Sequence, residues 1–95
     1  MPRSKLLIHI DILRVLALHG PLNLTHILYR VNISATFLKP YLGFLIERNL
    51  VTEHPVSKAR FIYAITESGL TVLRYFRELH RALPVTEKEN EIPHI

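Results

Sequence analysis

Apolar side chains recur with a helical period in four stretches of this chain. They lie three or four positions apart, which predicts four helices, each with a buried face, over residues 5–19, 24–31, 35–48 and 67–83. Two shorter stretches separate the third helix from the fourth. Their alternation and their β-branched and aromatic side chains predict the strands of a hairpin at Leu50–Glu53 and Phe61–Ile65.

Polar and special residues stand where these elements should begin and end. Side-chain oxygens that can cap a helix N-terminus precede the four helices, at Ser4, Asn23, Ser34 and Thr66. Gly20-Pro21 ends the first helix, Asn49 can take the left-handed conformation after the third, and Pro84 ends the fourth. The third helix contains Pro40, which removes a backbone donor and predicts a bend.

The spacing also assigns the buried faces. In the first helix we expect the core to take Leu6, Ile10, Leu13 and Ala17, widened by Ile12, Val15 and Leu16. The second helix contributes Ile27, Leu28 and Val31, and the third contributes Leu38, Leu42, Leu45 and Ile46. Between the two strands, residues 54–60 are expected to form a projecting loop that contains Pro55.

Composition and charge indicate the size of the domain and the kind of partner that it could bind. The chain of 95 residues fits one small domain, and 48% hydrophobic residues are enough for a packed core. Residues 1–83 hold 11 Lys/Arg against 5 Asp/Glu (+6), and residues 84–95 hold 1 against 3 (−2), which together give the net charge of +4. A basic domain favours a polyanionic partner, although charge that merely keeps the protein in solution explains it equally well.

The sequence holds no pattern for catalysis, a cofactor or a membrane span. There are no cysteines, and the six histidines lack metal-ligand spacing. The longest apolar run, residues 6–18, is too short to cross a bilayer. We expect no enzyme, cofactor, metal site or small-molecule substrate, and a cytoplasmic protein.

Three helices followed by a hairpin are the layout of a winged helix-turn-helix, an α+β fold that is mainly helical. The third helix would then enter a major groove of DNA. Its side away from the core carries Thr36, Lys39, Pro40, Gly43 and Glu47. No Arg, Asn or Gln lies there to make bidentate hydrogen bonds to guanine or adenine, so we expect modest sequence specificity. The alternative is that this helix only packs and Lys39 is a solvated charge.

Further DNA contacts are predicted outside the third helix. Lys58 and Arg60 in the hairpin could straddle a phosphate backbone or enter a minor groove. Arg3 and Lys5 at the first helix, and Ser34 at the third, could bind phosphate near a helix N-terminus, although ordinary capping also explains Ser34. The aromatic residues Phe37, Tyr41 and Phe44 share one side of the third helix. Stacking on single-stranded bases is conceivable for them, but we expect packing against the first helix or the hairpin.

The fourth helix has more apolar surface than a three-helix core can cover. One stripe consists of Leu73, Phe76, Leu79 and Leu83, and a second set of Leu70, Val72 and Tyr75. Such a stripe can be intramolecular core, but its width favours a homodimer. We expect the interface to contain Val72, Phe76, Leu79 and Leu83.

Several segments resemble an archaeal winged-helix family that includes the small dimeric chromatin proteins of archaea. The resemblance covers residues 5–83. It rests on Thr25-x-Ile27-x-Tyr29-x-x-Asn32-Ile33-Ser34, on Tyr41-Leu42, Leu45 and Asn49-Leu50-Val51, and on Tyr63-x-Ile65-Thr66-x-x-Gly69-x-x-x-Leu73. Asn49 stands where the family commonly has glycine, Pro40 is unusual, and the fourth helix is shorter than the long coiled-coil helix of the chromatin proteins.

The resemblance implies a winged helix-turn-helix that dimerises through its last helix and binds double-stranded DNA, as a transcription regulator or a chromosomal protein of the nucleoid. By position, the contacts would come from Ser34, Thr36 and Lys39 and from the hairpin residues Lys58 and Arg60. We therefore divide the chain into a DNA-binding core (1–66), a dimerisation helix (67–84) and a flexible charged tail (85–95). The alternative is a winged-helix module that binds proteins and not DNA.

Overall fold

The helices begin where side-chain oxygens meet free backbone N–H groups. The computed structural model describes residues 3–83, in which the helices are α1 (Lys5–His19), α2 (Leu24–Val31), α3 (Ala35–Glu47) and α4 (Glu67–Ala82). Ser4, Asn23 and Thr66 cap α1, α2 and α4 by accepting from the backbone N–H of the residue three positions on. Ser34 occupies the same position before α3, but its side chain makes no capping hydrogen bond.

Left-handed residues close the turns after three of the helices. Gly20 follows α1 with a φ of 81°, Asn32 follows α2 with 64°, and Asn49 follows α3 with 62°. Asparagine tolerates this conformation better than other non-glycine residues, so the expected role of Asn49 is confirmed. Helix α3 continues through Pro40 without a break.

Three antiparallel strands form the sheet of the described residues, in the order β1-β3-β2. They are β1 (Leu22–Asn23), β2 (Val51–Ser57) and β3 (Arg60–Ile65). Strand β1 pairs through Leu22 with Tyr63, which ties the start of α2 to the hairpin. The sequence pattern missed β1, because two residues are too few to show a period.

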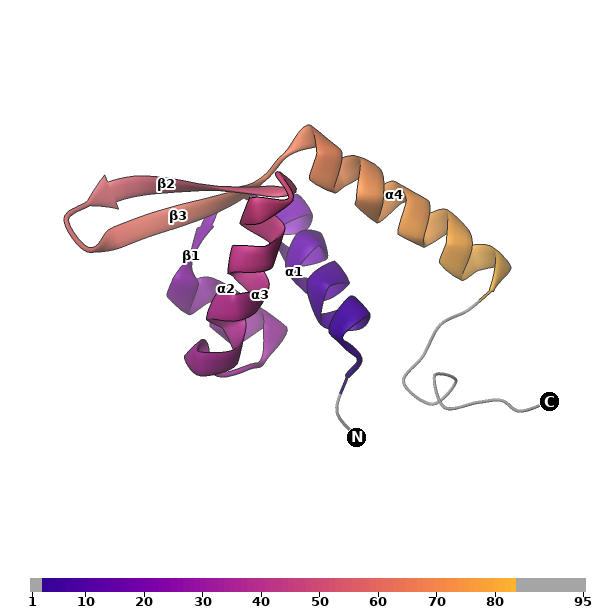
Figure 1. Cartoon of the computed structure of the whole chain (residues 1–95), viewed down its shortest axis with the longest axis horizontal. Helices are drawn as coiled ribbons and strands as arrows, with labels where there is room; N and C mark the ends of the chain where they lie inside the picture. The colour runs from indigo at the N-terminus through magenta and orange to yellow at the C-terminus, as the bar shows by residue number, and fades with distance from the viewer. Residues whose placement is uncertain (1–2, 84–95) are drawn as a thin grey trace.

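The β2–β3 hairpin, which we call the wing, differs from the expected one. The loop predicted over residues 54–60 is wrong, because β2 continues to Ser57 and only Lys58 and Ala59 turn the chain. Pro55 had suggested a break. It is accommodated because β2 is an edge strand of the sheet, with a bulge between Pro55 and Ser57. The wing is therefore a long ribbon, and it projects from the helices on the side opposite to α4 (Figure 1).

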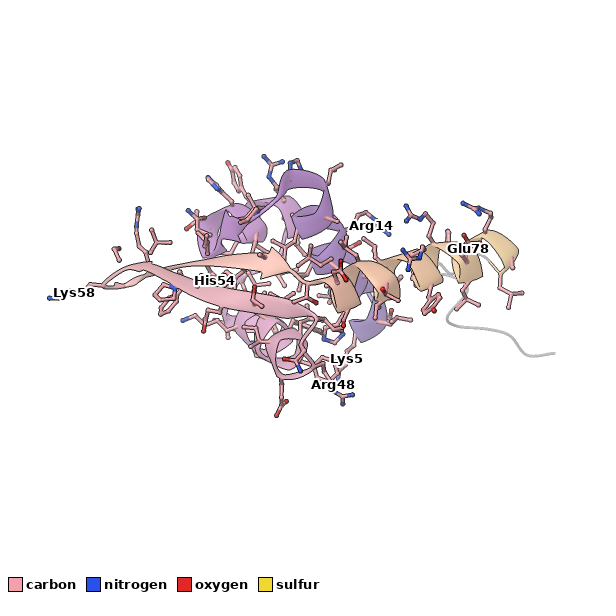
Figure 2. All side chains as sticks on the ribbon, turned by 90° about the horizontal axis from the view of Figure 1, so that it is seen from above. Lys5, Arg14, Arg48, His54, Lys58 and Glu78 are labelled. Carbon is pink, nitrogen blue, oxygen red and sulfur yellow. The ribbon has the colours of Figure 1, made fainter. Side chains whose placement is uncertain are left out.

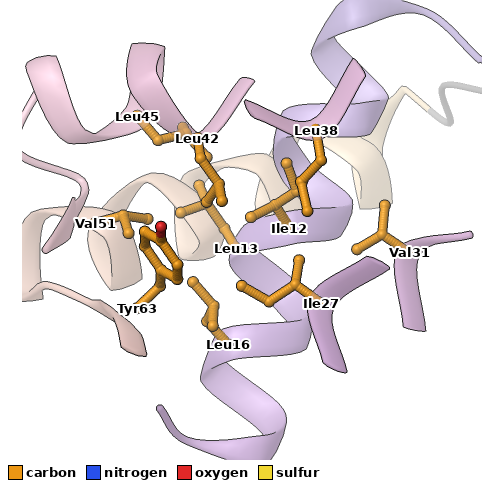
Figure 3. Close-up of a cluster of buried hydrophobic side chains, with 10 residues drawn as sticks. All are labelled: Ile12, Leu13, Leu16, Ile27, Val31, Leu38, Leu42, Leu45, Val51 and Tyr63. Atoms are coloured by element: carbon orange, nitrogen blue, oxygen red, sulfur yellow. The ribbon is translucent and has the colours of Figure 1, made fainter. Parts of the chain in front are cut away.

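One hydrophobic cluster holds helices and sheet together (Figure 3). It consists of Ile12, Leu13, Leu16, Ile27, Val31, Leu38, Leu42, Leu45, Val51 and Tyr63. Each buried Leu, Ile or Val stabilises the fold by ~1.5–3 kcal/mol relative to an exposed side chain. The expected stripe of α1 is wrong at its ends, since Leu6 and Ala17 are exposed and the buried face runs through Ile12 and Leu16. The predicted buried face of α1 is therefore rotated about the helix axis relative to the observed one.

Helix α4 is attached at its N-terminal end. Thr66 accepts from the N–H of Gly69 and donates to the carbonyl of Asn49 at 2.7 Å. Gly69 is the buried residue of α4, and a Cβ atom there would collide with the Leu50 carbonyl and the Ile65 side chain. From this junction α4 runs out past α1, away from the wing (Figure 1). Pro84 and the expected tail 85–95 lie outside the described residues.

Candidate nucleic-acid interface

The outer face of α3 is as the sequence predicts. Thr36, Lys39, Pro40, Gly43 and Glu47 are all exposed, on the side away from the buried Leu38, Leu42 and Leu45. Gly43 has open space around the position of a Cβ atom. Helix α3 therefore offers a slim, accessible surface of the width that a major groove admits.

A groove of about 610 Å³ separates this face from the wing. Lys39, Leu42 and Gly43 form part of the α3 wall, and Ala59, Phe61 and Tyr63 part of the wing wall. A smaller groove of about 270 Å³ lies between the wing and the start of α2, where Asn23 and Thr25 face Arg60. We call the surface made by Thr36, Lys39, Gly43, Lys58 and Arg60 the α3–wing face.

The structure adds the start of α2 to the predicted site. Asn23 and Thr25 share the smaller groove with Arg60, because β1 pairs with β3 and draws the α2 N-terminus under the wing. Local sequence gave no signal for this proximity, because it depends on the pairing of a two-residue strand with a strand about 40 residues later.

The two wing cations extend the surface. Lys58 lies in the turn at the tip of the wing (Figure 2), and Arg60 begins the returning strand. Both side chains are exposed. A projecting ribbon with cations at its tip can reach the phosphate backbone beside the groove that α3 would occupy.

Arg3 and Lys5 are not brought to the α3–wing face. The Arg3 guanidinium pairs with Asp11 at 2.7 Å and donates to the Val31 carbonyl at 2.8 Å, so it clamps the start of α1 to the end of α2. Asp11 also pairs with Arg14 at 2.9 Å. Lys5 lines a groove on the other flank of α3, together with Phe37 and Tyr41.

A carboxylate is held in the groove between α3 and the wing. The Tyr63 hydroxyl donates to Glu53 at 3.0 Å, and the two residues face each other across the β2–β3 ladder. Burial, with the hydrogen bond to Glu53 and its negative charge, raises the pKa of Tyr63 to about 12. The protonated Tyr63 hydroxyl donates at physiological pH and holds the Glu53 carboxylate at the wall of the groove.

The aromatic side of α3 follows the expectation only in part. Tyr41 and Phe44 pack against His9 of α1, with ring centroids 4.8 and 4.7 Å away. Burial lowers the pKa of His9, so its ring packs as a neutral aromatic. Phe37, for which packing was also expected, remains 66% exposed.

Residues 3–83 contain no cluster of three His, Cys, Asp or Glu side chains that could hold a metal ion. In the same range, none of the helices is long and apolar enough to cross a membrane.

The sequence matches a family model described as a winged helix-turn-helix over residues 2–83. No curated protein matches the chain at a significant level. The observed elements, with an α3–wing face beside a helical core, agree with that description.

Solved structures share the fold. Sso10a-2 from Sulfolobus solfataricus, a DNA-binding protein, is 25% identical with a TM-score of 0.73, and the match covers 84% of this chain and 81% of that one. BpsR from Bordetella bronchiseptica, whose DNA binding is regulated by 6-hydroxynicotinic acid, is 19% identical with a TM-score of 0.74 over 86% of this chain. RV1404 from Mycobacterium tuberculosis is 25% identical with a TM-score of 0.70 over 79% of this chain. The chain spans only 64% of the BpsR chain and 53% of the RV1404 chain.

Proposed function

The chain belongs to the winged helix-turn-helix family, and from that premise we propose that it binds double-stranded DNA as a homodimer. Helix α3 enters the major groove, and the wing lies on the phosphate backbone or in the adjacent minor groove. The protein acts as a transcription regulator or a chromosomal protein in the archaeal cytoplasm, associated with the nucleoid. The DNA-binding activity of Sso10a-2 and of BpsR supports the choice of DNA as partner.

The observation that carries this proposal is the α3–wing face. It combines an exposed helix and a projecting ribbon with three cations: Lys39 lines the larger groove, Arg60 lines the smaller one, and Lys58 is exposed in the turn of the wing. Thr36 and Ser34 stand at the exposed start of α3, where hydroxyls can bond a phosphate. The outer face of α3 carries Lys39 but no Arg, Asn or Gln, the residues that read guanine or adenine through two hydrogen bonds. Contacts to phosphates therefore dominate the binding, and readout of the base sequence is weak.

The dimer is proposed to form through α4. Tyr75 is 67% exposed, Leu79 51% and Leu83 64%, while α4 contacts its own chain mainly through its first half. With Val72 and Phe76, these side chains form one stripe on the helix. Covering that stripe with the same stripe of a second copy would remove from water the apolar surface that the monomer leaves open.

Charge removal tests the DNA interface. We expect a variant with Lys39, Lys58 and Arg60 all changed to Gln to bind random-sequence duplex at least tenfold more weakly than wild type, measured by fluorescence anisotropy at low salt. The matched control changes three cations of α4, Arg74, Arg77 and Arg81, to Gln, and should bind within about threefold of wild type. Equal losses in both variants would mean that net charge alone drives binding, and the proposed interface would be wrong.

A further inference from the structure

The flank of α3 that turns away from the wing carries a second groove, of about 500 Å³. We call it the aromatic groove, and it is lined by Lys5, His9, Phe37, Pro40, Tyr41 and Phe44. Lys39 and Gly43 line the groove on the wing side, so the two grooves lie on opposite flanks of the same helix. The DNA interface proposed above does not use this one.

Aromatic surface is left open in this groove. Phe37 is 66% and Phe44 is 40% exposed. The floor is aromatic, because the His9 ring packs on Tyr41 and Phe44. Exposed aromatic side chains this close together are unusual on a protein surface with no partner.

The charges at the rim are all positive. Lys5 lines the groove, and the Arg48 guanidinium lies over the Phe44 ring, 4.6 Å from its centroid. Lys5 and Arg48 lie on the same side of the molecule, opposite Arg14 (Figure 2). No Asp or Glu is among the residues that line the groove. A partner that fits must therefore be flat and apolar in one part and anionic in another.

We propose that the aromatic groove binds single-stranded DNA, with bases stacked on Phe37 and on the Phe44–Arg48 pair and phosphates beside Lys5 and Arg48. Every base has an aromatic face, so such a platform accepts any sequence, and a basic rim follows the backbone. Phe37 and Phe44 are seven residues apart, about 10 Å along the helix. That length matches about three base steps of 3.4 Å each.

A second copy of the chain fits this groove less well. The apolar stripe of α4 is accompanied by Arg74, Arg77 and Arg81 against Glu67 and Glu78, so its helix would bring positive charge to a positive rim. Nucleic acid supplies both the flat rings and the negative charge. The choice of DNA over RNA rests on the proposed function, since α3 is the element proposed to lie in a DNA duplex, whereas binding of a single strand does not depend on it. An unpaired strand next to a bound duplex would lie along this flank.

The test measures two ligands on the same proteins. A labelled thymine oligonucleotide of about 12 nucleotides, within the usual site size, is titrated with wild type and with Phe37→Ala, and anisotropy gives the affinity. We expect Phe37→Ala to weaken single-strand binding at least about fivefold, the loss of one stacked base, and to leave duplex affinity within about twofold. The control is Tyr29→Ala, an exposed aromatic residue on α2 that belongs to neither proposed interface, which should change neither affinity. Circular dichroism melting confirms that each variant is folded.

The outcomes separate this proposal from the duplex proposal. Unchanged single-strand affinity in Phe37→Ala, or no single-strand binding by wild type, overturns the aromatic groove as a strand site even if duplex binds. If wild type binds the single strand but no duplex, the proposed function is wrong and this site stands; if Phe37→Ala loses duplex and single-strand affinity alike, the aromatic groove is not a separate strand site. If a uridine RNA of the same length binds more tightly than the DNA strand, the assigned occupant is wrong.

Discussion

Two glycines of this small domain are constrained in opposite ways, and the difference can be measured. At Gly69 a Cβ atom would collide with the Leu50 carbonyl and lie 2.6 Å from Ile65 Cγ1, whereas at Gly43 it would meet nothing within 4 Å. We predict that Gly69→Ala destabilises the fold by about 1–3 kcal/mol, the cost of overpacking. Gly43→Ala should instead stabilise it by about 0.5–1 kcal/mol, because alanine favours a helix interior. Urea unfolding of both variants checks this, and a Gly69→Ala protein as stable as wild type would mean that α4 does not approach the sheet closely.

Tyr63 gives a residue-scale prediction in alkaline solution. Its pKa is raised from 10.0 to about 12 in the folded protein, so the neutral form is favoured by folding. The stability that this contributes is fully present below pH 10 and is lost as the pH rises through about 12. We predict that Tyr63→Phe loses less stability than wild type between these two pH values, measured by urea unfolding at each pH. Parallel loss in the two proteins would contradict the buried, Glu53-bonded position of the hydroxyl.

At the scale of elements, capping and turn residues were enough to locate the helices, whereas the extent of the strands depends on pairing between distant segments. Caps such as Thr66 and turn residues such as Asn49 are read within a few positions, so helix bounds were predicted to within a residue. The length of β2 was not, because Pro55 reads locally as a break and only its place on a sheet edge makes it acceptable. Leu6 was assigned to the core because periodicity fixes the spacing of a face but not its direction.

Helix α4 carries the element-scale prediction about assembly. Leu79 and Leu70 are exposed to 51% and 43%, and nine residues at 100° each place them on opposite sides of the helix. We predict that Leu79→Glu shifts the sedimentation coefficient toward the monomer, because it puts a charge into the proposed apolar interface. Leu70→Glu, the matched control, should sediment like wild type. If wild type is already a monomer at high concentration, or if both variants dissociate alike, the stripe around Leu79 is not the dimer contact.

At the scale of the whole molecule, the site was predicted as separate pieces that only the fold could combine. Lys39, Lys58 and Arg60 were found from the sequence, and in the structure Lys39 lines the larger groove, Arg60 the smaller one, and Lys58 is exposed at the tip of the wing. Arg3 was grouped with them because it is a cation near a helix start, yet its guanidinium holds Asp11 and the end of α2. Thr25 was missed as a site residue, because its place beside the wing follows from β1 pairing with β3. The number of cations can be counted from the sequence, but only the fold shows which of them are already engaged by a carboxylate or a carbonyl of the same chain.

The central claim is that this protein binds DNA through the phosphates. Its most direct test is the titration of a random-sequence duplex at several salt concentrations. Neutralising phosphates with Lys39, Lys58 and Arg60 should give a log–log slope of affinity against salt of about −3 for one protomer and about −5 for a dimer, at 0.9 per contact. The account predicts tight binding near 50 mM salt that falls with such a slope toward 200 mM, the range over which counterion release is usually measured. A folded protein that leaves the duplex unbound at the lowest salt, or binds it with an affinity independent of salt, would contradict it.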